Sequence, residues 1–173
     1  MEIAADILKI TIPALLVLLA SVLILRNMIK NNQNTRRQEL LLQNNKTITP
    51  IRLQAYERVV LFLERISLES LLVRVSSPDM SASQLHSMLL NTIRNEFEHN
   101  LSQQIYMSPQ AWEVVKSARS NTIKTINNEA EKLPAKSTGM DLTKRLFEQI
   151  VELEKEPTRV AIDFLKGEIA RIF

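Results

Sequence analysis

The chain has no cysteine, only two glycines, and few aromatic residues, which make up 5% of its 173 residues. Without cysteine it can form no disulfide framework, thiolate nucleophile or cysteine-ligated metal site. With Gly139 and Gly167 as its only glycines, it cannot build a glycine-rich loop that cradles phosphate or a glycine-flanked nucleophile turn. These absences exclude the familiar nucleotide-binding and hydrolase motifs.

Alternating strand patterns are also missing, whereas residues that favour helices, such as Leu, Glu, Lys and Gln, are abundant. From position 50 onward, apolar residues recur at helical spacing in several segments separated by Ser, Pro and Gly. The expected helix starts are marked by a capping residue followed by proline or glutamine, at Thr49 with Pro50, Ser81 with Gln84, and Ser108 with Pro109. The pattern predicts an all-α protein whose domain is an antiparallel bundle of five or six helices.

The expected helices of this domain cover about residues 50–66, 67–75, 81–105, 108–133, 142–156 and 158–173. In the third of them, apolar residues recur every four positions, at Leu85, Leu89, Ile93, Phe97 and Leu101. Residues 136–140, which include Gly139, are expected to connect two helices. We expect Phe97 to belong to the core.

The basic excess of the chain lies at its N-terminal end. Residues 1–49 hold six basic and three acidic side chains, a net charge of +3, whereas residues 50–173 hold 16 of each and net zero. A neutral domain attracts phosphate backbones poorly, so nucleic acid is not an expected partner. Basic residues beside an apolar segment instead suit anionic lipid headgroups.

That apolar segment comprises residues 10–25, which carry no charge. At 1.5 Å per residue it spans about 24 Å, shorter than a hydrocarbon layer of about 30 Å. Flanking apolar residues and the long side chains of Lys9 and Arg26 can extend it to the interface. The segment lacks the polar stripe of a core helix and the cleavage site of a signal peptide. We therefore predict a retained transmembrane helix, with the bilayer as a partner.

Four basic side chains follow this helix and so predict its orientation: Arg26, Lys30, Arg36 and Arg37. Because such residues stay on the cytoplasmic side, the N-terminus should lie outside and the C-terminal domain inside, at the inner (cytoplasmic) membrane of a bacterium. The predicted organisation is a tail and anchor over residues 1–30, a polar basic juxtamembrane stalk over 31–49, and a helical domain over 50–173.

Two stretches together resemble a known family. Residues 55–66 read Ala-Tyr-Glu-Arg-Val-Val-Leu-Phe-Leu-Glu-Arg-Ile, and residues 95–106 read Asn-Glu-Phe-Glu-His-Asn-Leu-Ser-Gln-Gln-Ile-Tyr, running on to Ala111 and Trp112. They are similar to an uncharacterised family of short, single-span membrane proteins from the Bacteroidota, a domain of unknown function. The resemblance implies an anchor and a helical domain along most of the chain, and it implies no activity or functional residue.

The motif Glu-x-x-His at Glu96 and His99 places a carboxylate and an imidazole on one helix face, as in carboxylate-bridged diiron bundles. Such a site needs two of these motifs, and the chain has one. These two residues are weak metal candidates, and no cofactor is predicted. A structural alternative is a network in which Glu96 pairs with an arginine or histidine and fixes helix register.

Three amphipathic aromatics, Tyr56, Tyr106 and Trp112, suit either packing with a polar tip at the surface or contact with a partner helix. The sequence favours a non-enzymatic function, in which the anchor holds a helical interaction or scaffold module that binds another protein or a second copy of itself. The alternative is an enzyme with an unfamiliar carboxylate and histidine site around Glu96, Glu98 and His99.

Overall fold

The computed structural model describes residues 2–152 and 155–172, and the side chains of residues 15–28, 48–152 and 155–171. The chain divides into two compact units, residues 1–49 and residues 50–173. The described residues form six α-helices and one 3₁₀ helix, with no strand among them. These elements are α1 (Glu2–Arg65), α2 (Leu68–Val75), α3 (Ala82–Asn100), η1 (Leu101–Tyr106), α4 (Pro109–Glu131), α5 (Gly139–Glu152) and α6 (Pro157–Ile172). The predicted all-helical fold is confirmed.

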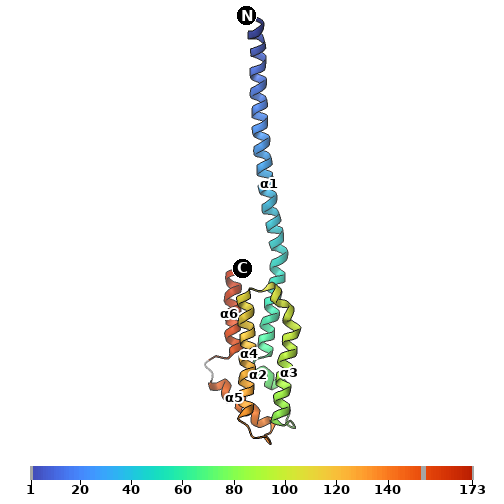
Figure 1. Cartoon of the computed structure of the whole chain (residues 1–173), viewed down its shortest axis with the longest axis vertical. Helices are drawn as coiled ribbons and strands as arrows, with labels where there is room; N and C mark the ends of the chain where they lie inside the picture. The colour runs from blue at the N-terminus through green and yellow to red at the C-terminus, as the bar shows by residue number, and fades with distance from the viewer. Residues whose placement is uncertain (1, 153–154, 173) are drawn as a thin grey trace. The chain divides into compact units, whose positions relative to one another are not determined.

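Within residues 50–173, the helices form a bundle around one hydrophobic core (Figure 1). Helix α4 packs along α6 and contacts α3 and α5, while α2 contacts α3 and α5. Helices α3 and α4 contact each other, and in Figure 1 they run in opposite directions. The end of α1 supplies four of the most buried core side chains, namely Tyr56, Val59, Phe62 and Leu63, and the buried Ile66 follows directly after the helix.

Two of the three predicted helix caps are present. The Ser81 hydroxyl accepts a hydrogen bond from the Gln84 backbone N–H, and the Gln84 side chain accepts one from the Ser81 N–H in return. The Ser108 hydroxyl accepts a hydrogen bond from the N–H of Ala111 at the start of α4. Each cap satisfies a backbone donor that the helix itself leaves without a partner.

The third predicted cap, Thr49 with Pro50, is wrong, because α1 continues through these residues. A helix can run through a proline if it gives up one backbone hydrogen bond and bends slightly. Helix α1 therefore starts at Glu2 rather than at Pro50, and it contributes to both units of the chain.

The predicted end of the third domain helix near Ile105 is also wrong. Helix α3 ends at Asn100, and η1 continues with three residues per turn instead of 3.6. The tighter winding breaks the four-residue apolar stripe, so that Leu101 is exposed whereas Leu85, Leu89 and Ile93 are buried. Phe97 lies at the edge of the core and is partly buried.

Helix α5 begins earlier than predicted, at Gly139 itself. The Gly139 N–H donates a hydrogen bond to the Met80 carbonyl oxygen over 2.6 Å, and a Cβ at this position would lie 2.9 Å from that same oxygen. Glycine thus permits the close approach of the α4–α5 loop to the start of α3.

In the part of the chain that the structure describes, no helix has a stretch that is both long and apolar enough to span a lipid bilayer. Residues 10–14 of the predicted span lie outside the described side chains, as do Lys30, Arg36 and Arg37 and nearly all of the predicted stalk. Arg26 is described and exposed.

Candidate functional site

The weak metal candidates Glu96 and His99 have other polar partners in the structure. The Oε1 atom of Glu96 accepts hydrogen bonds from Arg65, at 2.8 Å from Nε and 2.6 Å from Nη2, and lies 3.6 Å from Nη1 of Arg74. His99 is exposed, and its Nδ1 lies 2.7 Å from the backbone oxygen of Asn95 in its own helix. Glu98 is exposed as well. Among the described residues, no group of three or more acidic or histidine side chains is placed to hold an ion.

Glu96 instead belongs to a network that connects three helices. Arg65 is the last residue of α1, Arg74 lies in α2, and Glu96 lies in α3. Arg74 also donates a hydrogen bond from Nη2 to the Arg65 carbonyl oxygen, which is left without a helical partner at the end of α1. The Glu96 side chain is only 17% exposed, and both guanidinium groups approach its Oε1. Such charge-assisted contacts hold the carboxylate in one position.

A second carboxylate is more deeply buried than Glu96. The side chain of Glu129 in α4 is 5% exposed and pairs with Lys132, and its Oε2 lies 3.6 Å from Nη1 of Arg145 in α5. The contact between Glu129 and Arg145 joins α4 to α5, as the Glu96 network joins α1, α2 and α3. No sequence pattern indicates this contact, because Glu129 belongs to no motif and Arg145 lies in another helix.

Two of the three predicted contact aromatics lie in the core. Tyr56 is fully buried, and its hydroxyl is one of three buried side-chain atoms without a hydrogen-bond partner in the described part of the chain. Burial raises the pKa of the Tyr56 phenol, since the charged form loses its hydration. Trp112 is 8% exposed and stacks on Phe97, with ring centroids 5.6 Å apart. Packing within the domain accounts for both residues, whereas Tyr106 is 41% exposed.

Phe97 stands at the centre of an aromatic group. Its ring also contacts Phe62 of α1 at a centroid distance of 5.9 Å, and the Arg119 guanidinium lies 4.2 Å from its centroid. A cation over an aromatic face is attracted by the ring quadrupole. The aromatic side chains therefore connect α1, α3 and α4 and close the edge of the core.

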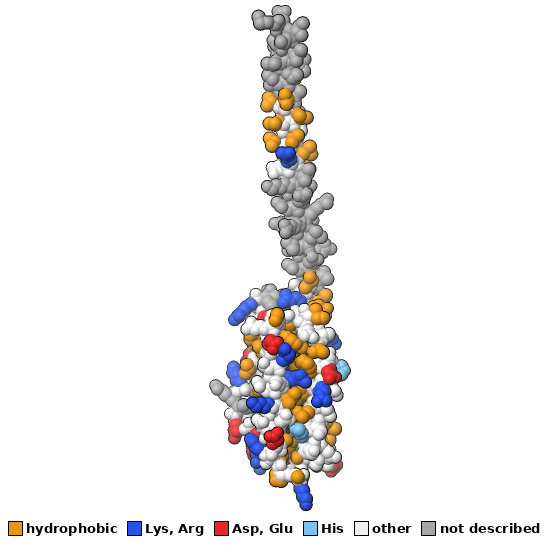
Figure 2. Space-filling model, viewed as in Figure 1, with side chains coloured by type: hydrophobic (Ala, Val, Ile, Leu, Met, Phe, Trp, Pro, Cys, Tyr) orange, Lys and Arg blue, Asp and Glu red, His pale blue; other side chains and the backbone are white. Residues whose placement is uncertain are grey.

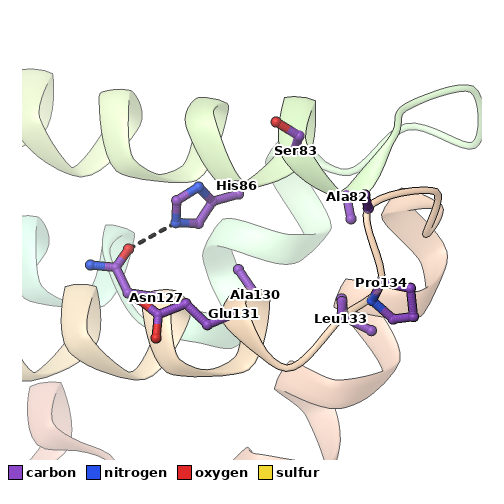
Figure 3. Close-up of a pocket in the computed structure, with 9 residues that line it drawn as sticks. Ala82, Ser83, His86, Asn127, Ala130, Glu131, Leu133 and Pro134 are labelled. Atoms are coloured by element: carbon purple, nitrogen blue, oxygen red, sulfur yellow. Dashed lines mark hydrogen bonds between the residues drawn. The ribbon is translucent and has the colours of Figure 1, made fainter.

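A pocket of about 280 Å³ lies between the start of α3, the end of α4 and the α4–α5 loop (Figure 3). Its polar groups are Ser83, His86, Asn127 and Glu131, and its apolar wall comprises Ala82, Ala130, Leu133, Pro134 and Ala135. In Figure 3 the His86 ring points across the gap between the two helices toward Asn127, and its Nε2 lies 2.8 Å from the amide oxygen. Because an amide oxygen only accepts, Nε2 carries the proton.

This hydrogen bond limits the chemistry of the pocket. His86 is hydrogen-bonded to Asn127, and among the described residues no hydrogen bond joins its ring to Ser83, so the histidine and the serine are not arranged as a base and its nucleophile. The pocket is open and small compared with sites that enclose drug-sized ligands. No sequence pattern indicates this pocket, because its residues come from two segments that are distant in the sequence and carry no recognisable spacing.

The described residues of the N-terminal unit present a different surface. Ten large apolar side chains in residues 15–28 are between 42% and 68% exposed. They are Leu15, Leu16, Val17, Leu18, Leu19, Val22, Leu23, Ile24, Leu25 and Met28. Because they occupy nearly consecutive positions of a helix, they face all directions around its axis. Figure 2 shows hydrophobic side chains along this segment.

Comparisons with known proteins identify the family of the chain. The model of a family described as a family of unknown function (DUF7935) matches residues 2–172, almost the whole chain. No curated protein and no solved structure matches the chain significantly.

Proposed function

Because the chain belongs to this family of unknown function, we propose its role from its own surfaces: it is a membrane-anchored helical interaction or scaffold module. Residues 1–30 are the anchor, the bilayer of the inner membrane is one partner, and the domain of residues 50–173 acts at the cytoplasmic face. The single-span character that the resemblance implies is part of this proposal, and an origin in the Bacteroidota remains a prediction.

The observation that carries the anchor is the exposure of ten large apolar side chains in residues 15–28. Burying apolar surface gains about 25 cal/mol per Å², so such a segment is strongly driven out of water. A helix that is apolar on all sides is covered either by protein or by lipid. The absence of charge over residues 10–25 and the basic side chains that follow favour lipid.

The proposal of a non-enzymatic role for the domain rests on how its charged side chains are used. Glu96 and Glu129, its least exposed ion-paired carboxylates, are engaged by arginine and lysine in contacts that join helices. His86 is held by Asn127, and His99 is held by its own helix. Each of these groups has a structural partner, which supports a domain built to present surfaces.

The orientation is tested by fusing a reporter that is active only in the cytoplasm after Phe173 of the full-length chain. We expect activity with this reporter and silence with one that works only outside the membrane. Neutral replacements of Arg26, Lys30, Arg36 and Arg37 should weaken the preference, because these residues retain their side of the helix in the cytoplasm. Activity of only the external reporter would contradict the proposed location.

A further inference from the structure

Helix α5 has a second apolar face, which points away from the core. Leu142 and Leu146 are buried within the domain, whereas Met140, Phe147 and Val151 are 61%, 40% and 85% exposed. With Thr143, Lys144, Glu148 and Glu152, these three side chains line a shallow apolar groove along the outside of α5. Figure 1 shows α5 at the edge of the bundle.

The spacing of this outer face is that of a coiled-coil seam. Met140, Lys144, Phe147 and Val151 follow one another at steps of four, three and four residues. Alternating steps of three and four keep side chains on the line where one helix packs against another. A single charged residue in such a seam is a known means of fixing register and orientation at some cost in stability.

The order of residues along this seam is self-complementary. In an antiparallel pair of α5 helices related by a two-fold axis, Met140 meets the partner's Val151 at both ends. In the two inner layers, Phe147 meets the apolar stem of the partner's Lys144. The ammonium group of that lysine then lies beside Glu148 of the chain that supplies Phe147. A parallel pair would instead place the two Lys144 side chains against each other, and like charges in one layer repel.

We propose that this face of α5 binds the same face of a second copy of the chain, in antiparallel orientation. The inference deepens the proposed function and rests on it, because the domain acts as an interaction module that the anchor confines to a membrane. It names the partner of that module as the chain itself. The seam is complementary to itself, because it would have apolar layers at both ends and a lysine beside a glutamate in the middle. This self-complementarity favours a second copy of the chain over an unrelated helix.

The contact is expected to be weak between free domains. Two helices that meet over four layers bury less than the 1,200 Å² or more typical of stable interfaces. Confinement to one membrane raises the effective concentration of two chains and so compensates for a small interface. The test therefore uses the full-length chain.

Because the chain contains no cysteine, single cysteines report the geometry without background. Two differently tagged full-length chains, one with Met140→Cys and one with Val151→Cys, are co-expressed and oxidised in isolated membranes. A disulfide requires Cα atoms about 4.4–6.8 Å apart. The antiparallel pair brings positions 140 and 151 together but separates the two copies of position 140 by about 16 Å along the helix axis.

We expect a cross-link between the two tags in the mixed sample and little in samples of Met140→Cys alone. A cross-link of position 140 to itself would show a parallel pair, and a mixed sample without cross-links would show that α5 does not pair. Either result would overturn the inference. An Ile105→Cys chain mixed with Val151→Cys is the matched control, since Ile105 is 76% exposed in η1.

A second variant separates pairing from folding. Phe147→Asp should lower the cross-linked fraction about tenfold, which corresponds to about 1.4 kcal/mol, whereas Ile105→Asp should leave it unchanged. Circular dichroism of both variants checks that the fold persists, which is expected because both residues are exposed. An unchanged cross-link with Phe147→Asp would contradict the proposed seam. Sedimentation of the tagged chains with membranes is recorded in the same samples, so a failed anchor is distinguished from failed pairing.

Discussion

At the scale of single residues, burial and local partners decide which side chains of α3 matter for stability. Phe97 is partly buried and contacts Phe62, Trp112 and Arg119. Two positions later, His99 is exposed, and its Nδ1 lies 2.7 Å from the backbone oxygen of Asn95 in its own helix. Of these two residues, Phe97 is therefore expected to contribute more to the stability of the fold than His99.

Phe97→Ala is expected to lower the free energy of unfolding by about 3 kcal/mol, the lower end for a large aromatic residue, because Phe97 is only partly buried. His99→Ala should change it by about 0.5 kcal/mol or less, as for most exposed positions. Urea denaturation followed by circular dichroism measures both. A larger loss from His99→Ala than from Phe97→Ala would show that the imidazole belongs to a functional or structural network.

Glu156 gives a pH dependence with a defined sign. Its Oε1 accepts a hydrogen bond from the Leu68 N–H at 2.8 Å, and burial raises the pKa of its carboxyl, with Glu69 and Glu64 adding to the rise. Because the pKa of Glu156 is higher in the folded state than in the unfolded state, its protonation stabilises the fold. That stabilisation is fully present below the unfolded-state pKa of Glu156 and is lost as the pH rises through its folded-state pKa. Asp141 has the opposite sign, because hydrogen bonds from Thr138 lower the pKa of its carboxyl.

Glu156→Gln should therefore remove one source of instability at neutral pH while keeping an oxygen that accepts from Leu68. Glu156→Ala should be less stable than Glu156→Gln, since a part-buried N–H loses its acceptor. The measurement is the free energy of unfolding of both variants between about pH 4 and pH 8, with Asp141→Asn as a control whose loss appears above the unfolded pKa of Asp141. Equal stability of Glu156→Ala and Glu156→Gln would show that the contact to Leu68 contributes nothing.

At the scale of helices, the sequence predicted those features that depend on neighbouring residues. The Ser81 and Ser108 caps were predictable because each side chain bonds a backbone N–H three positions away. The end of α3 at Asn100 was not predictable, because the chain continues there as the 3₁₀ helix η1. The start of α5 at Gly139 was not predictable either, because Gly139 contacts Met80 from a distant segment. The continuation of α1 through Pro50 likewise overrides a local signal.

The two glycines test this distinction. Gly139→Ala should destabilise the domain by about 1–3 kcal/mol, because its Cβ would lie 2.9 Å from the Met80 oxygen and force the backbone apart. Gly167→Ala in α6 should stabilise it by about 0.5–1 kcal/mol, since nothing lies within 4 Å of the added methyl group and alanine favours the helix. Thermal unfolding of the two variants should move in opposite directions. Equal shifts would contradict the close approach at Gly139.

At the scale of the whole molecule, the candidate site was less predictable than the fold. Apolar periodicity indicates which side of a helix is buried, but not which distant residue a charged group meets. The partners of Glu96 and Glu129 and the pocket around His86 arise only when helices pack. From the sequence, we could predict that Glu96 pairs with an arginine or histidine. The sequence did not identify Arg65 or Arg74 as the partners.

The domain is expected to fold without the N-terminal unit. A chain that begins at Thr47 retains the whole core, which lies between Tyr56 and Leu165. It also retains Thr49 and Pro50, which can cap a helix that now starts there. It should be strongly helical by circular dichroism and remain in solution without detergent. Aggregation of this shortened chain would mean that a surface of the domain needs a cover that residues 1–46 provide or recruit.

The most direct test of the proposed anchor is to extract membranes with alkaline carbonate, which releases proteins bound only at the surface. The proposal predicts that the full-length chain remains with the lipid, which would bury the exposed apolar side chains of residues 15–28. The chain that begins at Thr47 should be released or absent from the membranes. Complete release of the full-length chain would contradict a membrane-spanning anchor and, with it, the proposal of a membrane-anchored module.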